Sequence, residues 1–216
     1  MKNSHCESRS ARGLKFRCAR GLTLTELVVV LVILVALGGV AVTNLRSTAE
    51  QGSEIAAQTS VNEVRDAVMQ YWSDCKYLYP AAPASDQRLL MGDLLVSPFA
   101  PEDDFDPQIA LGWNGEYLQY DLRNTYTVDI ANGFTTSYGT LTDFAVLDVY
   151  GRPMVIQEPT LANLAPDASY VLGDTREVRV VSAGQNGVLE IDEALFESQL
   201  TPANQGDDIY VSFTLR

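Results

Sequence analysis

The sequence predicts an α+β fold in which one long N-terminal helix precedes an antiparallel β-sheet. The first observation is a proline-free stretch over residues 22–72, in which residues 27–42 carry no polar side chain. The second is a change to frequent proline and glycine after residue 77. The third is a series of later segments in which β-branched and aromatic residues alternate, as in strands.

The helix has two halves of different character. Residues 22–44 are almost wholly apolar and approach the length of about 20 residues that spans a bilayer. Residues 45–76 are amphipathic, because small and apolar residues recur at a spacing of three to four, from Ala49 and Ala56 to Val64 and Val68. A basic leader, residues 1–21, precedes the helix, and a globular β-rich domain, residues 77–216, follows it.

Within the globular domain the alternating pattern predicts strands and one short helix. The helix is predicted over Asp86–Val96. The strands are predicted at Glu116–Tyr120, Tyr126–Ile130, Phe144–Val149, Met154–Gln157, Glu177–Ser182 and Ile209–Leu215.

The charge is unevenly distributed along the chain. The formal net charge is -13, yet residues 1–21 carry +5, which leaves -18 for residues 22–216. Such an acidic chain lacks the basic face that binds the nucleic-acid backbone, so we expect that nucleic acid is not a main partner and that none is required. We therefore expect the partners to be proteins or the membrane.

Few residues with catalytic chemistry lie outside the leader. The single histidine is His5, and of the three cysteines only Cys75 lies beyond residue 21. A chain without the leader would therefore have no histidine chemistry, intrachain disulfide or zinc cluster. The sequence also lacks a phosphate loop of the G-x-x-x-x-G-K-[ST] type and a G-x-S-x-G nucleophile elbow. We expect that the protein is not an enzyme.

The apolar stretch with basic residues before it predicts an N-terminus in the cytoplasm and an exported remainder. A plain membrane anchor and a secretory signal peptide, cleaved near Gly39 and Ala41 or near Ser47 and Ala49, are alternatives. Glu26 favours a more specific role, because a carboxylate at the edge of a membrane helix is costly and calls for a partner.

Gly21, Leu22 and Glu26, followed by the aliphatic helix, resemble the processing site of type IV prepilins and type II secretion pseudopilins. This resemblance implies that a prepilin peptidase cuts between Gly21 and Leu22 and methylates Leu22. It also implies that Glu26 and Leu22 are assembly determinants, with the Glu26 carboxylate paired to the amino group of a neighbouring subunit. The leader is longer than in many members, and Leu22 stands where phenylalanine is commonest.

Two later segments are similar to those of the major, G-type pseudopilins. Residues 112–118 (GWNGEYL) resemble a GW-x-G-P-Y-L stretch, with Glu116 in place of proline. Residues 148–154 (DVYGRPM) resemble a D-P-W-G-x-P-Y turn, with Tyr150 in place of tryptophan. The resemblance implies a pilin-like lollipop fold, with the helix packed on a C-terminal antiparallel sheet.

Residues 181–187 and 206–209 resemble the calcium loop of the same family. Asp207 and Asp208 are the expected ligands, since calcium prefers carboxylate and carbonyl oxygens. Asn186 stands where an aspartate is common, and Asp192, between the two halves, could substitute for it. The alternative is a β-turn with surface acids and no metal.

The resemblance implies a structural subunit that polymerises into a pseudopilus for type II protein secretion. The implied partners are further copies of the chain, other pseudopilins, the prepilin peptidase, and an inner-membrane platform with its ATPase. The implied location is the inner membrane, with a single span and a periplasmic C-terminal domain. A type IV pilin or minor pilin is an alternative, and a tethered, exported binding module is another.

Overall fold

The structure is a computed structural model of the 216-residue chain. It describes residues 23–76, 88–99, 105–119, 124–164 and 174–216, without the side chains of residue 38 and residues 40–47. Gly21 and Leu22, the predicted processing residues, lie outside the described residues. The chain divides into two compact units, Met1–Ser47 and Thr48–Arg216.

Helix α1 runs over Leu24–Cys75 and so has residues in both units. In the first unit, its large apolar side chains from Leu24 to Leu37 are between 49% and 79% exposed, so none of the described residues covers them. Among the described residues, no helix combines the length and the apolar composition needed to cross a membrane.

In the second unit, α1 buries one face. Val61, Val64 and Val68 are fully buried, whereas the charged residues between them lie on the opposite side. The predicted apolar face also included Ala49 and Ala56, and that part of the prediction is wrong because both are exposed. Spacing alone cannot show where burial begins, since alanine is common in exposed helices as well.

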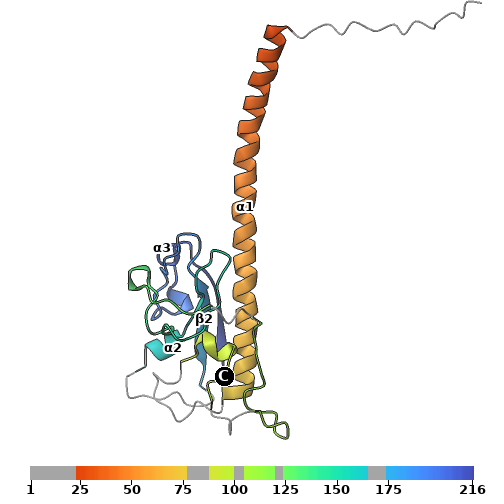
Figure 1. The fold of residues 1–216 in the computed structure, drawn as a ribbon. Helices are drawn as coiled ribbons and strands as arrows, with labels where there is room; N and C mark the ends of the chain where they lie inside the picture. Colours follow the sequence, from red (N-terminus) through yellow and green to blue (C-terminus); the bar gives the residue numbers. More distant parts are fainter. Residues whose placement is uncertain (1–22, 77–87, 100–104, 120–123, 165–173) are drawn as a thin grey trace, which may run out of the picture. The chain divides into compact units, whose positions relative to one another are not determined.

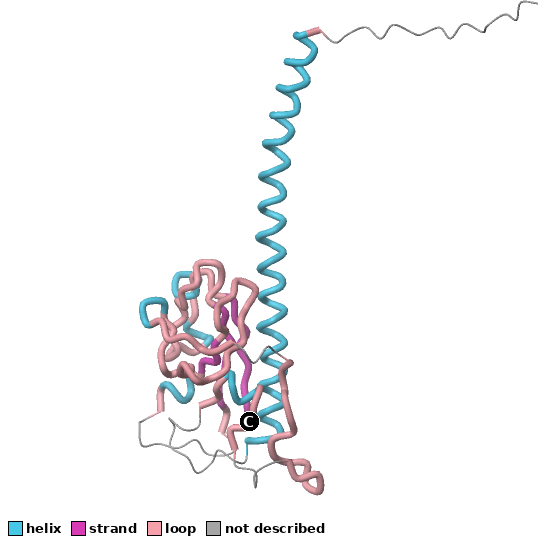
Figure 2. Tube along the Cα trace, in the orientation of Figure 1, coloured by secondary structure: helices cyan, strands magenta, loops and turns pink. Residues whose placement is uncertain are grey.

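The sheet has three antiparallel strands in the order β1–β2–β3, with β1 at Val155–Gln157, β2 at Arg176–Ser182 and β3 at Ile209–Leu215. Figure 1 shows β2 beside the C-terminal part of α1, and Figure 2 shows that loops make up most of this unit. The α+β prediction is confirmed, although the sheet is smaller than expected. Short helical turns occur at η3 (Met91–Leu94), η5 (Ile130–Asn132), α2 (Pro159–Ala162), η6 (Glu197–Gln199) and α3 (Pro202–Gln205).

Three of the predicted strands do not form. The described residues of 116–120, 126–130 and 144–149 form bends, turns and isolated bridges, such as that between Thr125 and Phe144, but no strand. One cause is the η5 turn, which ends at Gly133 with a left-handed backbone and reverses the chain after only a few residues. The predicted helix over Asp86–Val96 is likewise reduced, in the described residues, to η3.

The core surrounds the central strand. Val178 and Val180 of β2 belong to the larger apolar cluster, together with Val64 and Val68 of α1. On the other side, Val181 joins a smaller cluster built around aromatic side chains of the loops. Both faces of β2 are therefore buried, although its sequence, REVRVVS, includes two arginines and a glutamate.

A buried ion pair lies beside this core. Arg176 and Glu158 are 0% and 1% exposed, and Nη2 of the arginine is 2.6 Å from Oε2 of the glutamate. Oε1 of Glu158 accepts the backbone N–H of Leu89 at 2.7 Å, and the Arg176 guanidinium lies 4.9 Å from the ring centre of Trp72. The pair therefore links the first residue of β2 to α1 and to two loops.

The two pseudopilin-like segments are connected to the core by hydrogen bonds. The backbone N–H of Gly112 donates to the carbonyl of Asp74, and the Trp113 indole donates to the carbonyl of Asp93. In the second segment, the Asp148 carboxylate accepts the backbone N–H groups of Tyr150 and Arg152, both at 2.9 Å. Both segments act as structural turns that fix loops against α1 and the sheet.

Candidate functional site

The first candidate site is the N-terminal end of α1. The Thr23 backbone N–H donates to Oε2 of Glu26 at 2.8 Å, and the Glu26 backbone N–H donates to Oγ1 of Thr23 at 3.3 Å. The Thr23 hydroxyl donates to the same Oε2 at 2.9 Å. This reciprocal pattern is a capping box, which satisfies two backbone donors at the start of a helix. It accounts for the start of α1 at Leu24.

The capping box gives Glu26 a local role that we did not predict. A plain anchor helix would gain from the same reciprocal cap, so the Glu26 carboxylate is not by itself specific to a filament subunit. The Thr-x-x-Glu spacing of Thr23 and Glu26 could have indicated it. Because both bonds from Thr23 use Oε2, the described residues leave Oε1 of Glu26 without a hydrogen bond.

We predict that Thr23→Val weakens the start of α1 by about 1 kcal/mol, because valine has no hydroxyl to cap the helix. Amide hydrogen exchange of residues 24–27 in the full chain should then be about five-fold faster. Thr25→Val is the matched control, since the Thr25 hydroxyl contacts only that of Thr23 in this site. Equal exchange in the two variants would contradict a capping role for Thr23.

The second candidate site lies where residues 184–190 meet residues 206–208. The Asn186 backbone N–H donates to Oδ2 of Asp207 at 2.9 Å, and its side-chain amide donates to Oε1 of Glu190 at 2.5 Å. Oδ2 of Asp208 accepts the backbone N–H groups of Glu190 and Ile191, both at 2.8 Å. The structure thus brings the predicted residues Asp207 and Asp208 together with Asn186, and it adds Glu190.

Two glycines allow the segments to approach closely. A Cβ atom on Gly184 would lie 2.2 Å from the carbonyl oxygen of Asp207, and one on Gly206 would lie 2.3 Å from the Glu190 carboxylate. Both glycines have φ of 57°, which favours glycine. The backbone at Gly184 therefore packs directly against Asp207, and the backbone at Gly206 packs directly against Glu190.

Asp208 is 9% exposed, and the surroundings of its carboxylate disfavour a negative charge. Burial raises the pKa of Asp208 to about 7 against the opposing effect of its two backbone donors, and the charges of Glu190 and Asp207 raise it further. Oδ1 of Asp208 and Oε2 of Glu190 are buried without a hydrogen-bond partner among the described residues. Such atoms fit a hard cation, because calcium binds carboxylate oxygens.

The third predicted ligand, Asp192, has other contacts. Its side chain is exposed, and its Oδ1 accepts the backbone N–H of Ala194 at 2.9 Å. Its backbone carbonyl accepts a bond from the buried Arg179 at 2.7 Å. Across the part of the chain that the structure describes, no three histidine, cysteine, aspartate or glutamate side chains form a metal-ligand group. A cation at the second site would therefore use fewer carboxylates, together with carbonyl or water oxygens.

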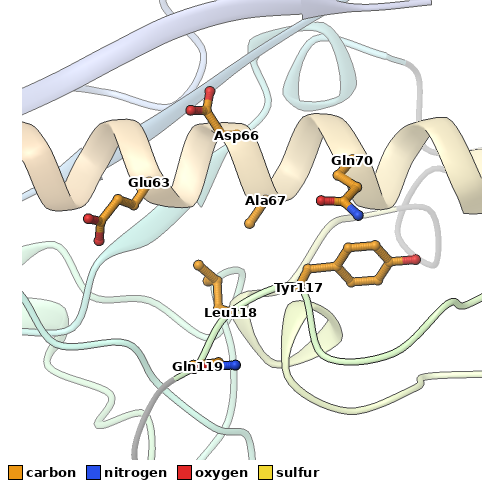
Figure 3. Close-up of a pocket in the computed structure, with 7 residues that line it drawn as sticks. All are labelled: Glu63, Asp66, Ala67, Gln70, Tyr117, Leu118 and Gln119. Carbon is orange, nitrogen blue, oxygen red and sulfur yellow. The ribbon is translucent and has the colours of Figure 1, made fainter.

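A groove of about 410 Å³ lies between α1 and the loop of residues 117–119. Figure 3 shows that Ala67 of the helix faces Leu118 of the loop, whereas Asp66 and Glu63 point away from each other. The groove thus has polar side chains at its rim but no convergent acid, base or nucleophile among its lining residues. It gives no support to a catalytic function.

Cys75 is buried close to this groove. Its Sγ lies 3.9 Å from the Tyr117 hydroxyl, and burial raises the pKa of the thiol to about 12. The thiol is therefore protonated at neutral pH and has little nucleophilic character.

Comparison with known proteins gave no match to a family model, to a curated protein or to a solved structure.

Proposed function

We propose that the protein is a structural subunit of a pseudopilus that supports type II protein secretion, and that it polymerises through the N-terminal part of α1. The observation that carries this proposal is the exposed apolar row from Leu24 to Leu37, which begins next to the exposed carboxylate of Glu26. An apolar surface of this extent calls for lipid or for other protein surfaces. A pilin-like fold belongs to the same proposal.

The proposed contact joins Glu26 to the neighbouring subunit. Cleavage after Gly21 would create an α-amino group at Leu22, and this group would pair with the Glu26 carboxylate of another copy. Pairing reduces the free-energy cost of burying either charge alone. A stagger between neighbouring subunits that separates the two charges is therefore disfavoured. The capping box supports this arrangement, because Thr23 orients one carboxylate oxygen and leaves Oε1 for the amine.

The remaining partners follow from the same proposal. The prepilin peptidase would process the chain, and an inner-membrane platform with its ATPase would supply the work of assembly. Before assembly, residues 22–44 would hold the chain in the inner membrane with the basic leader in the cytoplasm. The acidic remainder would then lie in the periplasm.

Calcium is the proposed cofactor, and Asp207 and Asp208 remain its proposed binding region. When bound, the ion would supply positive charge between carboxylates that otherwise repel one another. Within the chain, Asp208 orients the backbone of residues 190–191, and Asp207 holds that of Asn186. These contacts fix the segment before β3 against the segment after β2.

The mass and N-terminal residue of the protein from native membranes test the processing step. We expect a chain that begins at N-methylated Leu22. A chain that begins at Met1 would indicate a plain anchor, and one that begins after Ala41 or Ala49 would indicate a secreted protein. Either of these results would contradict the pseudopilus proposal.

A further inference from the structure

Two carboxylates of the second candidate site have one satisfied and one unsatisfied oxygen each. Asn186 satisfies Oε1 of Glu190, and two backbone N–H groups satisfy Oδ2 of Asp208. The other oxygens, Oε2 of Glu190 and Oδ1 of Asp208, are buried and have no partner among the described residues. Buried polar atoms almost always have a partner, so these two oxygens are the atoms of the site that can bind a ligand.

A cation is the ligand that suits both oxygens. Two carboxylates that share a buried region repel each other, and a neutral donor such as water would leave that repulsion in place. A hard divalent cation can bind both carboxylate oxygens, and backbone carbonyls and water can complete its coordination shell. A zinc-type site does not fit, because the only cysteine in the described residues is Cys75 and the only histidine, His5, lies outside them.

We propose that Glu190, rather than Asp192, joins Asp208 in binding the calcium ion, each through its unpartnered buried oxygen. This inference rests on the calcium part of the proposed function. Asn186 cannot supply a carboxylate, but its side chain holds that of Glu190. Gly206 lies directly against the Glu190 carboxylate. The side chain of any larger residue at this position would occupy the space that the carboxylate fills.

The pair joins two distant parts of the sequence. Glu190 lies after β2, near the start of the insert of residues 188–205. Asp208 immediately precedes β3. The rest of the insert is held separately, because Arg179 donates to the carbonyls of Asp192 and Leu195, both at 2.7 Å. Calcium would therefore stabilise the start of the insert against β3, while Arg179 holds its middle without an ion.

The test compares Glu190→Gln with Asp192→Asn in the full chain, solubilised in detergent. Both substitutions remove one negative charge, and they lie two residues apart. Thermal unfolding is followed by tryptophan fluorescence, since Trp72 and Trp113 both lie in the second unit. Each protein is measured in EDTA and in calcium chloride, and calorimetry gives the calcium Kd.

We expect calcium at about 100 times its Kd to raise the Tm of the natural chain by about 5–10 °C. Asp192→Asn should retain this shift. Glu190→Gln should lose most of it and weaken the calcium Kd by about 100-fold or more, because a binding oxygen has lost its charge. In EDTA its Tm should not fall, because the glutamine side-chain amide can donate to Oδ1 of Asp208 and the repulsion is removed.

The remaining outcomes are distinguishable. If Glu190→Gln keeps the calcium shift, or if it lowers the Tm equally in EDTA and calcium, Glu190 does not bind the ion. A loss of the shift in Asp192→Asn alone would assign the ligand to Asp192 and overturn the inference. If the natural chain shows no calcium shift, the proposed cofactor fails together with the inference, and the proposal on Glu26 is unaffected.

Discussion

Glu26→Gln is expected to reduce fibre assembly by more than about 100-fold, because it leaves the neighbouring α-amino group buried without a counter-charge at a cost of several kcal/mol. Glutamine is also a good residue for this position of a capping box, so α1 should still begin at Leu24. The substitution therefore separates the local role of Glu26 from its proposed role between subunits. Fibres are counted by electron microscopy, with cross-linking as a second measure.

Two further variants make the result specific. Glu54→Gln removes an exposed carboxylate elsewhere on α1 and should assemble normally. Glu26→Ala removes both the charge and the cap, so it should lose assembly and also show faster amide exchange at the helix start. Normal fibre yield from Glu26→Gln would contradict amine pairing, and a tethered binding module would tolerate both changes at Glu26.

The second large effect is expected at the buried ion pair. Arg176→Met should lower the free energy of unfolding by about 3–5 kcal/mol, because Glu158 would be left buried without its counter-charge. The contact between the guanidinium and Trp72 would be lost as well. Urea unfolding of the full chain in detergent, followed by circular dichroism, measures the change.

Arg65→Met is the matched control for this experiment. Arg65 also pairs with a carboxylate, that of Asp66, at 2.6 Å, but the two side chains are 32% and 67% exposed. An exposed pair contributes at most about 1 kcal/mol, so the control should lose little stability. The double variant Arg176→Met with Glu158→Gln should recover part of the loss, since it removes the unpaired charge. Equal effects of Arg176→Met and Arg65→Met would contradict a buried, coupled pair.

The candidate site was predictable only in part. Glycines and acids near the C-terminus indicated a cation loop, and the structure places Asp207 and Asp208 in one cluster with Asn186. The structure adds Glu190 to this cluster, and the sequence did not indicate it because a carboxylate in an insert carries no local signal of burial. The sequence also does not show that Arg179 binds the backbone carbonyl of Asp192, whose side chain is exposed.

The sequence by itself determined the elements whose signal is local. The long proline-free stretch predicts α1, and runs of β-branched residues predict the segments that become β2 and β3. The Thr23-x-x-Glu26 spacing determines where α1 begins. Such features depend on propensity, periodicity and capping, which act between residues close together in the chain.

Only the tertiary structure decided which segments pair and which charges are buried. Residues 126–130 and 144–149 have strand-like composition, but tight turns such as that at Gly133 leave them with isolated bridges. Arg176 and Glu158 look like ordinary surface residues in the sequence, yet they form a buried pair. The physical reason is the same in each case: burial and pairing depend on contacts between residues distant in the chain, which no local pattern encodes.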